Sequence, residues 1–314
     1  MAAEPQVDAF HLTFTGLEGV DLDGQTKIAL SDGFFLSQRT PQLVGVLDDS
    51  FWMGTAEKAG MKNVDSFFCL KSVRPLPSDQ EANRFQNGLM ALQIVKPVPT
   101  IGYIFPGTAI GEGYVSVNHT ERRPAMFAGE WSALRRFDHG LINHSKALMP
   151  KVLARMETGS AEQRNSVILL QLALEHFHPL VKGLFAVMGL EALLDSQDRN
   201  DFRRKLCARL AESTCVFPDW NSPSAPPPSR YRVADIALHL YTLRSKIAHG
   251  VDLRKAAHDK NVPVDLTGRV ELIEQLEPRP YGSLLSEAAV YILCLVLQRE
   301  LGAAPQTQQC VATI

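Results

Sequence analysis

Residues 241–250 read YTLRSKIAHG, and this stretch predicts the end of an amphipathic helix that begins near Arg232. Apolar side chains recur at the three- and four-residue spacing that forms one helical stripe, which we expect to face a hydrophobic core. The members of this stripe are Val233, Ile236, Leu240, Leu243 and Ile247. The segment therefore predicts a helix packed inside a helical domain.

The other side of this helix is polar. At about 100° per residue, Tyr241, Ser245 and His249 lie opposite the apolar stripe, and Arg244 lies at its edge. Gly250 suits the left-handed position that ends a helix. His249 then occupies the last turn, where the helix dipole favours imidazolium, whereas a nearby Arg244 favours the neutral ring. The sequence leaves the protonation state of His249 open.

Helical periodicity extends through most of residues 126–303, for which we predict an all-helical domain. We expect that Pro150 breaks the first helix and that Pro179 kinks or splits the second. The Pro- and Ser-rich residues 217–230 predict a mobile surface loop. The predicted helices are Gly129–Met156, Ala161–Asp195, Asp201–Thr214, Arg232–His249 and Ser283–Leu301.

The N-terminal residues 1–125 instead predict a strand-rich α+β domain of unknown role. Short runs of β-forming residues are separated by Gly, Pro, Asp and Asn, and one helix is expected at Asp79–Val95 with Ser78 as its cap. The predicted strands are Val7–Phe14, Lys27–Gln38, Phe67–Val73, Thr100–Phe105 and Tyr114–His119. Residues 107–113 predict a turn, and residues 304–314 a disordered tail. The fold class is multidomain α+β.

Composition points to a cytoplasmic protein without a membrane segment. The net charge of −2 gives no general basic surplus, so any nucleic-acid site must be a local patch. The five cysteines include no CxxC pair, which indicates reduced thiols. The apolar run 284–298 is interrupted by Ser286 and Glu287 and is too short to span a bilayer. His139 with His144, and His176 with His178, are poorly spaced for one metal ion, so we expect neither a metal nor another cofactor.

The motif Arg244-x4-His249, followed by Gly250 at a helix end, resembles the signature of HEPN domains, and most closely their ApeA-like branch. A second matching segment lies upstream, where residues 189–194 read GLEALL and a basic helix follows with Arg203, Lys205 and Arg209. The resemblance covers roughly residues 130–303. It implies a helical bundle that forms a homodimer through the motif helices, often with metal-independent endoribonuclease activity in antiphage or stress defence.

By this resemblance, Arg244 and His249 would be the catalytic pair on an RNA substrate. His249 would transfer a proton and Arg244 would bind the scissile phosphate, with Ser245 and Tyr241 in support. Four basic residues would contact the RNA backbone, namely Arg203, Arg204, Lys205 and Lys246. The N-terminal domain would bind a regulator or trigger.

A non-catalytic reading stays open beside this one. The helical domain would then be a scaffold or binding module that dimerises or contacts a partner or RNA. Arg244 would form an ion pair with an acidic neighbour, and His249 would cap its helix. We expect Glu191 to be structural in either case, paired with Arg203 or Arg209 inside the bundle.

Overall fold

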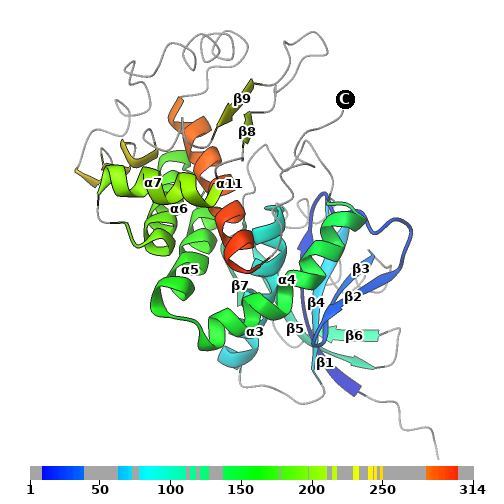
Figure 1. The fold of residues 1–314 in the computed structure, drawn as a ribbon. Helices are drawn as coiled ribbons and strands as arrows, with labels where there is room; N and C mark the ends of the chain where they lie inside the picture. Colours follow the sequence, from blue (N-terminus) through cyan, green and yellow to red (C-terminus); the bar gives the residue numbers. More distant parts are fainter. Residues whose placement is uncertain are drawn as a thin grey trace, which may run out of the picture. The chain divides into compact units, whose positions relative to one another are not determined.

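The computed structural model divides the chain into two compact units, Met1–Glu157 and Thr158–Ile314 (Figure 1). The residues that it describes are 9–38, 63–72, 78–110, 114–117, 121–126, 137–176, 178–196, 198–210, 214–217, 229–232, 240–242, 244–245, 248–249 and 281–302. A mixed α+β class is confirmed. The predicted tail 304–314 lies outside the described residues.

The first unit is built on an antiparallel sheet with strand order β2-β3-β4-β1-β5-β6, in which β7 also pairs with β5. The hairpin between β2 and β3 turns at Asp32 and Gly33, both with positive φ (45° and 87°), as tight hairpin turns require. The strands are β1 (Ala9–Leu17), β2 (Lys27–Ser31), β3 (Phe34–Gln38), β4 (Ser66–Ser72), β5 (Tyr103–Ile110), β6 (Tyr114–Val117) and β7 (Glu121–Arg122). We predicted a turn at residues 107–113, but residues 107–110 belong to strand β5. Residues 111–113 lie outside the described part of the chain.

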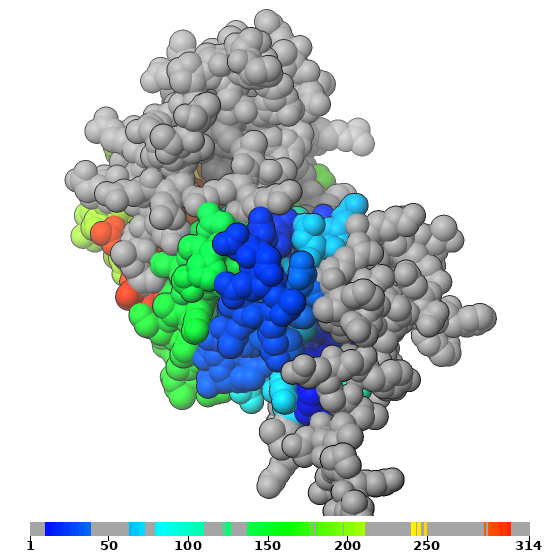
Figure 2. Space-filling model, turned by 90° about the vertical axis from the view of Figure 1, so that its right-hand side faces the viewer, coloured from blue at the N-terminus to red at the C-terminus, as the bar shows by residue number. Residues whose placement is uncertain are grey.

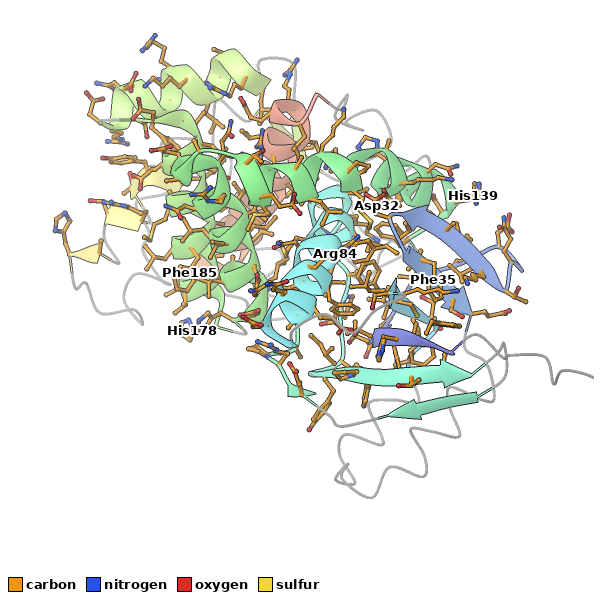
Figure 3. All side chains as sticks on the ribbon, turned by 90° about the horizontal axis from the view of Figure 1, so that it is seen from below. Asp32, Phe35, Arg84, His139, His178 and Phe185 are labelled. Atoms are coloured by element: carbon orange, nitrogen blue, oxygen red, sulfur yellow. The ribbon has the colours of Figure 1, made fainter. Side chains whose placement is uncertain are left out.

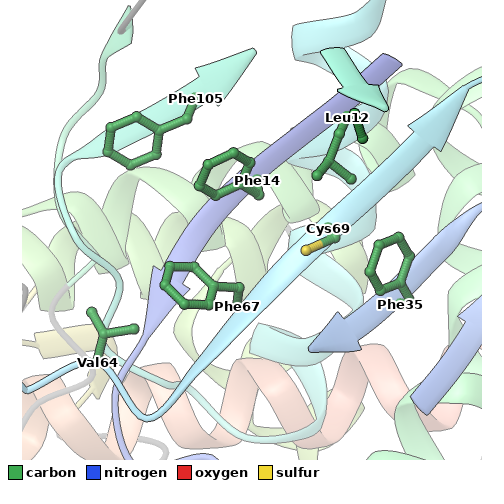
Figure 4. Packing of buried hydrophobic residues seen from close by; sticks show 8 residues of the cluster. Leu12, Phe14, Phe35, Val64, Phe67, Cys69 and Phe105 are labelled. Carbon is green, nitrogen blue, oxygen red and sulfur yellow. The ribbon is translucent and has the colours of Figure 1, made fainter. Parts of the chain in front are cut away.

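Aromatic side chains fill both faces of this sheet. On one face the Phe14 ring stacks on Phe105 (centroids 5.2 Å apart) and meets Phe67 edge-on (5.9 Å), as Figure 4 shows. On the other face Phe68 packs against Phe85 of α3 (Ser78–Val95), with ring centroids 5.2 Å apart. Four consecutive residues in the middle of β4, from Phe67 to Leu70, are apolar and buried rather than alternating with polar ones, so both faces of the sheet are covered at this strand.

Polar contacts hold α3 on its face of the sheet. Arg84 donates a hydrogen bond from Nη2 to the Asp32 carbonyl (3.0 Å), and both residues are labelled in Figure 3. The Thr13 hydroxyl donates to the Glu81 carboxylate. The helix predicted at Asp79–Val95 is confirmed, with its end before Pro97 as expected.

Helix α4 covers His139–Thr158, whereas the predicted helix began at Gly129. The predicted break at Pro150 is wrong, because Pro150 lies inside the continuous helix. Its start is fixed by backbone hydrogen bonds, from Phe137 N–H to Gly19 (2.8 Å) and from Asp21 N–H to Phe137 (3.1 Å). In Figure 2 the blue surface of the first strands adjoins a green surface in the colour of the chain around α4. The helix therefore belongs to the first unit up to Glu157, whereas we placed the domain boundary at residue 125.

The second unit is mainly helical. Helix α5 (Ala161–Glu175) begins with a capping box formed by Ser160 and Gln163, and α6 (Pro179–Leu194) begins at Pro179, so the predicted split of one long helix is confirmed. Helix α7 covers Arg199–Leu210, and α11 covers Tyr281–Glu300. Helix α6 packs against both α5 and α11.

An all-helical second unit was the wrong prediction, because a two-stranded antiparallel ribbon interrupts the helices. Strand β8 (Thr214–Phe217) pairs with β9 (Ser229–Arg232). The predicted third helix therefore ends at Leu210 rather than Thr214, and the ends of the loop predicted at 217–230 are strand residues. Residues 218–228 of that loop lie outside the described part of the chain.

Candidate functional site

The candidate site lies in the second unit on the helical residues 240–242, 244–245 and 248–249, here called the motif segment. The backbone N–H of His249 donates to the Ser245 carbonyl (3.0 Å), the i to i−4 bond of an α-helix. Leu240 is fully buried, as its place on the apolar stripe predicts. The predicted start of this helix at Arg232 is wrong, because Arg232 is the last residue of strand β9. Residues 233–239 lie outside the described part of the chain. Lys246 and Gly250 lie outside the described residues.

Tyr241 packs against helix α7. Its ring centroid lies 5.7 Å from that of Phe202, with a tilt of 52°, and Phe202 is fully buried. Tyr241 is half-buried, so part of its ring is already used for packing between the motif segment and α7. Its expected supporting role at the site is restricted to the part of the ring that Phe202 leaves uncovered.

Arg244 forms an ion pair with Glu191 of α6. The Nε atom of Arg244 lies 3.1 Å from Oε2 of Glu191, and the exposed fractions of the two side chains are 33% and 17%. The Nε–H does not point at the carboxylate well enough for a hydrogen bond within the described residues, so we treat the contact as electrostatic. The predicted pairing of Glu191 with Arg203 or Arg209 is therefore wrong.

Burial and the Arg244 charge act in opposite directions on Glu191. Burial raises the pKa of Glu191 above its ordinary value, and the Arg244 guanidinium opposes that rise without cancelling it. The direction follows because burial disfavours the charged carboxylate and an adjacent cation favours it. Arg244 therefore offsets part of the cost of ionising a half-buried carboxylate, and Glu191 contacts the guanidinium beside its Nε atom.

Ser245 and His249 lie farther along the motif segment. Ser245 is half-buried, and His249 is exposed at the end of the helix. Among the described residues, no hydrogen bond or ion pair of the His249 imidazole is found. The imidazole is therefore open to solvent and to a ligand, while the Arg244 side chain is fixed on one side.

Two of the basic residues predicted to contact RNA are engaged in ion pairs on α7. Arg204 and Lys205 both contact the Asp201 carboxylate, at 2.6 and 2.8 Å, and Lys205 Nζ also donates to the Asp195 carbonyl (2.5 Å). Arg203 is exposed. The Asp201 carboxylate thus offsets part of the positive charge that the sequence suggested for this patch.

Arg209 forms its own ion pair, with Glu300 of α11. Its Nε lies 2.7 Å from the Glu300 carboxylate, and its exposure is similar to that of Arg244. This second pair lies in the same unit but outside the motif segment. It provides a matched control for experiments on the Arg244–Glu191 pair.

The structure adds Glu191 and Phe202 to the site; sequence reasoning named Glu191 but gave it the wrong partner, and it missed Phe202. Glu191 stood within the GLEALL segment that carried the HEPN resemblance, but nothing in its spacing showed which cation it faces. Its position one residue after the buried Leu190 placed it at the margin of the apolar face, and that was the available signal.

Comparisons of the chain with models of protein families, with curated proteins and with solved structures find no match. Within the described residues, no cluster of three or more His, Cys, Asp or Glu side chains could hold a metal ion. None of the helices described is both long enough and apolar enough to cross a membrane. The arrangement of a fixed guanidinium and an exposed imidazole on one helix suits phosphate binding and proton transfer.

Proposed function

We propose that this protein is a metal-independent endoribonuclease of the HEPN type. The observation that supports this most is the pairing of roles on the motif segment. Arg244 is fixed by Glu191 yet one-third exposed, and His249 is exposed five residues later. A bound phosphodiester needs both a fixed cation and a group that moves protons.

In the proposed reaction the RNA 2′-hydroxyl attacks the adjacent phosphorus and the bond from phosphorus to the 5′-oxygen breaks. The products are a 2′,3′-cyclic phosphate and a 5′-hydroxyl. His249 transfers a proton in this step, a contribution of about 10²–10⁴-fold in rate. Arg244 binds the phosphate and stabilises its developing negative charge, and Ser245 donates a hydrogen bond to it. Tyr241 lines the site, and the solvent-facing Arg203 contacts the RNA backbone.

A second candidate function is a non-catalytic scaffold or binding module. It is favoured by the observation that two of the four motif residues have structural partners, Glu191 for Arg244 and Phe202 for Tyr241. In this case Arg244 stabilises the helical unit, and His249 has no chemical role. The two functions differ in what substitution of His249 does, because its side chain is exposed and contributes little to packing.

The deciding experiment compares RNA cleavage by the wild type, His249→Ala and Arg244→Ala, in the presence of a metal chelator. We expect loss of at least about 100-fold in rate for His249→Ala without loss of thermal stability. His139→Ala, at another exposed histidine, and Arg209→Ala, which breaks the second ion pair, are the matched controls and retain activity.

The substrate and products are checked in the same assay. RNA with a 2′-deoxy sugar at the cleaved position stays intact, because the nucleophile is missing. Mass spectrometry of the products identifies the cyclic phosphate. If the wild type and His249→Ala cleave RNA equally, or if the wild type cleaves no RNA, the endoribonuclease proposal is wrong and the scaffold function is favoured.

The larger role follows from the same proposal. We infer that the helical unit acts as the effector in antiphage or stress defence, and that the strand-rich first unit binds a regulator or trigger. We also infer a homodimer in which two motif segments meet. Expression of the active protein is then toxic to its host cell, and His249→Ala relieves the toxicity.

A further inference from the structure

We propose that Glu191 is the positioning residue of the site, which holds Arg244 by its Nε side so that the two terminal nitrogens face the RNA phosphate. This inference rests on the proposed function and adds a residue to it. The contact that carries it is the 3.1 Å approach of Glu191 Oε2 to Arg244 Nε.

The stereochemistry of the guanidinium gives the first argument. Its donors form a planar fork, and a carboxylate or phosphate takes two parallel donors along one edge. Glu191 lies beside the Nε atom of Arg244 without accepting a hydrogen bond from it. Within the described residues, the contact found for this guanidinium is the one with Glu191, so the edge formed by the two terminal nitrogens is available to a second anion. Arg244 can therefore hold Glu191 and a phosphate at the same time.

Burial gives the direction. The Glu191 side chain is 17% exposed and that of Arg244 is 33% exposed, so Arg244 is the more accessible member of the pair, although its Nε atom is buried beside the carboxylate. A phosphate that arrives from solvent meets the guanidinium first. Glu191 does not need to leave for the phosphate to bind.

The support beneath Glu191 is rigid. It is carried by α6, whose neighbouring Leu190 and Leu194 are buried, and which ends in a left-handed Asp195. A side chain on a packed helix holds its partner more precisely than one on a loop. Arg244 itself is a long side chain with several rotatable bonds, so fixing it before substrate arrives lowers the entropy lost on binding.

The test is a double-mutant cycle on the full-length protein with Glu191→Ala, Arg244→Ala and the double variant. Because Glu191 acts through Arg244, we expect Glu191→Ala to lower kcat by at least about tenfold, with a smaller change in KM. In the Arg244→Ala background, the second substitution adds no further loss. Equal losses from Glu191→Ala in both backgrounds indicate a general structural effect and overturn the inference.

One conservative variant and one control variant test the same inference further. Glu191→Gln keeps the length and one acceptor oxygen but removes the charge, so it recovers part of the activity. Glu300→Ala breaks the ion pair with Arg209 in the same unit and leaves kcat unchanged. If Glu300→Ala lowers kcat as much as Glu191→Ala, the effect is one of stability and the inference fails.

Binding of RNA that carries 2′-deoxy sugars separates this inference from the proposed function. The wild type binds this non-cleavable RNA more tightly than Glu191→Ala or Arg244→Ala, and the double variant binds no worse than Arg244→Ala. Absence of cleavage by the wild type overturns the nuclease, while the binding cycle still decides the role of Glu191. Equal binding by the wild type and Glu191→Ala overturns the inference in every case.

Discussion

Glu191 and Arg244 illustrate how a cation offsets the cost of burying a carboxylate. Burial makes the carboxylate costly to ionise, and the guanidinium offsets that cost. Removal of either partner leaves the other as a half-buried charge without its counter-ion. The free energy of unfolding therefore falls more when one member of the pair is removed than when both are removed.

The first prediction concerns Arg244→Met, which leaves Glu191 with burial as the dominant influence on its pKa. The pKa of Glu191 in the folded protein then rises further above that in the unfolded chain. The folded state binds the proton more tightly, so the free energy of unfolding falls as pH rises through that pKa and recovers on acidification. We expect a loss of about 1–3 kcal/mol at neutral pH, smaller at about pH 5.

Denaturant unfolding at the two pH values measures this change. The control is Arg244→Met combined with Glu191→Gln, which has no carboxylate to titrate at this position and so lacks the additional pH dependence. A pH dependence of Arg244→Met that matches this double variant would contradict the assignment of the raised pKa to burial of Glu191.

At the scale of helices and strands, the close approach of α6 and α11 depends on two glycines. A Cβ at Gly183 would overlap the Ser286 hydroxyl and would lie 2.9 Å from the Cβ and 3.1 Å from the Cα of Ser286, and the last two atoms cannot rotate away. A Cβ at Gly189 would lie 2.8 Å from Cδ2 of Leu293, the end of a flexible side chain. The two positions differ in how easily the obstacle can move.

The second prediction is that Gly183→Ala destabilises the helical unit although alanine is the better helix former. The propensity gain is about 1 kcal/mol, and overpacking against a backbone costs about 1–3 kcal/mol. Gly189→Ala, the matched control, costs less because Leu293 can rotate. Thermal denaturation measures both, and a second substitution, Ser286→Gly, reduces the penalty of Gly183→Ala. Equal stability of Gly183→Ala and the wild type would contradict this packing.

The same scale shows how far the sequence predicts the fold. The helix before Pro97, the division at Pro179 and the places of most strands in the first unit could be predicted, because each depends on local patterning or on a residue that interrupts it. The single strand predicted over Lys27–Gln38 was wrong, since it is the hairpin of β2 and β3, and β7 was missed. The ribbon of β8 and β9 could not, because Pro and Ser residues dominate the segment between these strands and obscure two four-residue strands. Pairing across the chain decides such short strands, and local composition does not.

The candidate site shows the same limit. The order of Tyr241, Arg244, Ser245 and His249 on one helix was readable from periodicity. Their partners were not, because Glu191 and Phe202 come from other helices of the unit. The start of α4 was missed for a similar reason, since the contact of Phe137 with Gly19 fixes it.

For the whole molecule, the geometry of a helix bears on the proposed dimer. Positions five residues apart on an α-helix differ by about 140° around its axis. Arg244 and His249 of one chain therefore start in different directions. In a symmetric dimer whose motif segments meet at the two-fold axis, each contact occurs twice, so an Arg244 that meets the His249 of the partner subunit forms two equivalent composite sites.

The third prediction tests this arrangement by mixing Arg244→Ala and His249→Ala proteins, each inactive alone. If the site combines residues from two protomers, each mixed dimer regains one intact site, and equal mixing restores about a quarter of wild-type activity. Dimerisation itself is measured by analytical ultracentrifugation. A dimer that gains no activity on mixing would show that each site uses one chain only.

The buried thiols of Cys69 and Cys294 can be used to measure local opening of each unit by chemical labelling. Neither forms a disulfide and both are buried, one on a central strand of the first unit and the other in α11 of the second, and burial raises the pKa of both above the ordinary value. Since only an accessible thiolate reacts with an alkylating reagent, each cysteine is silent until its surroundings open. Cys69 and Cys294 can thus each report local opening of its own unit, and a trigger that loosens one unit alone can be told from one that loosens both.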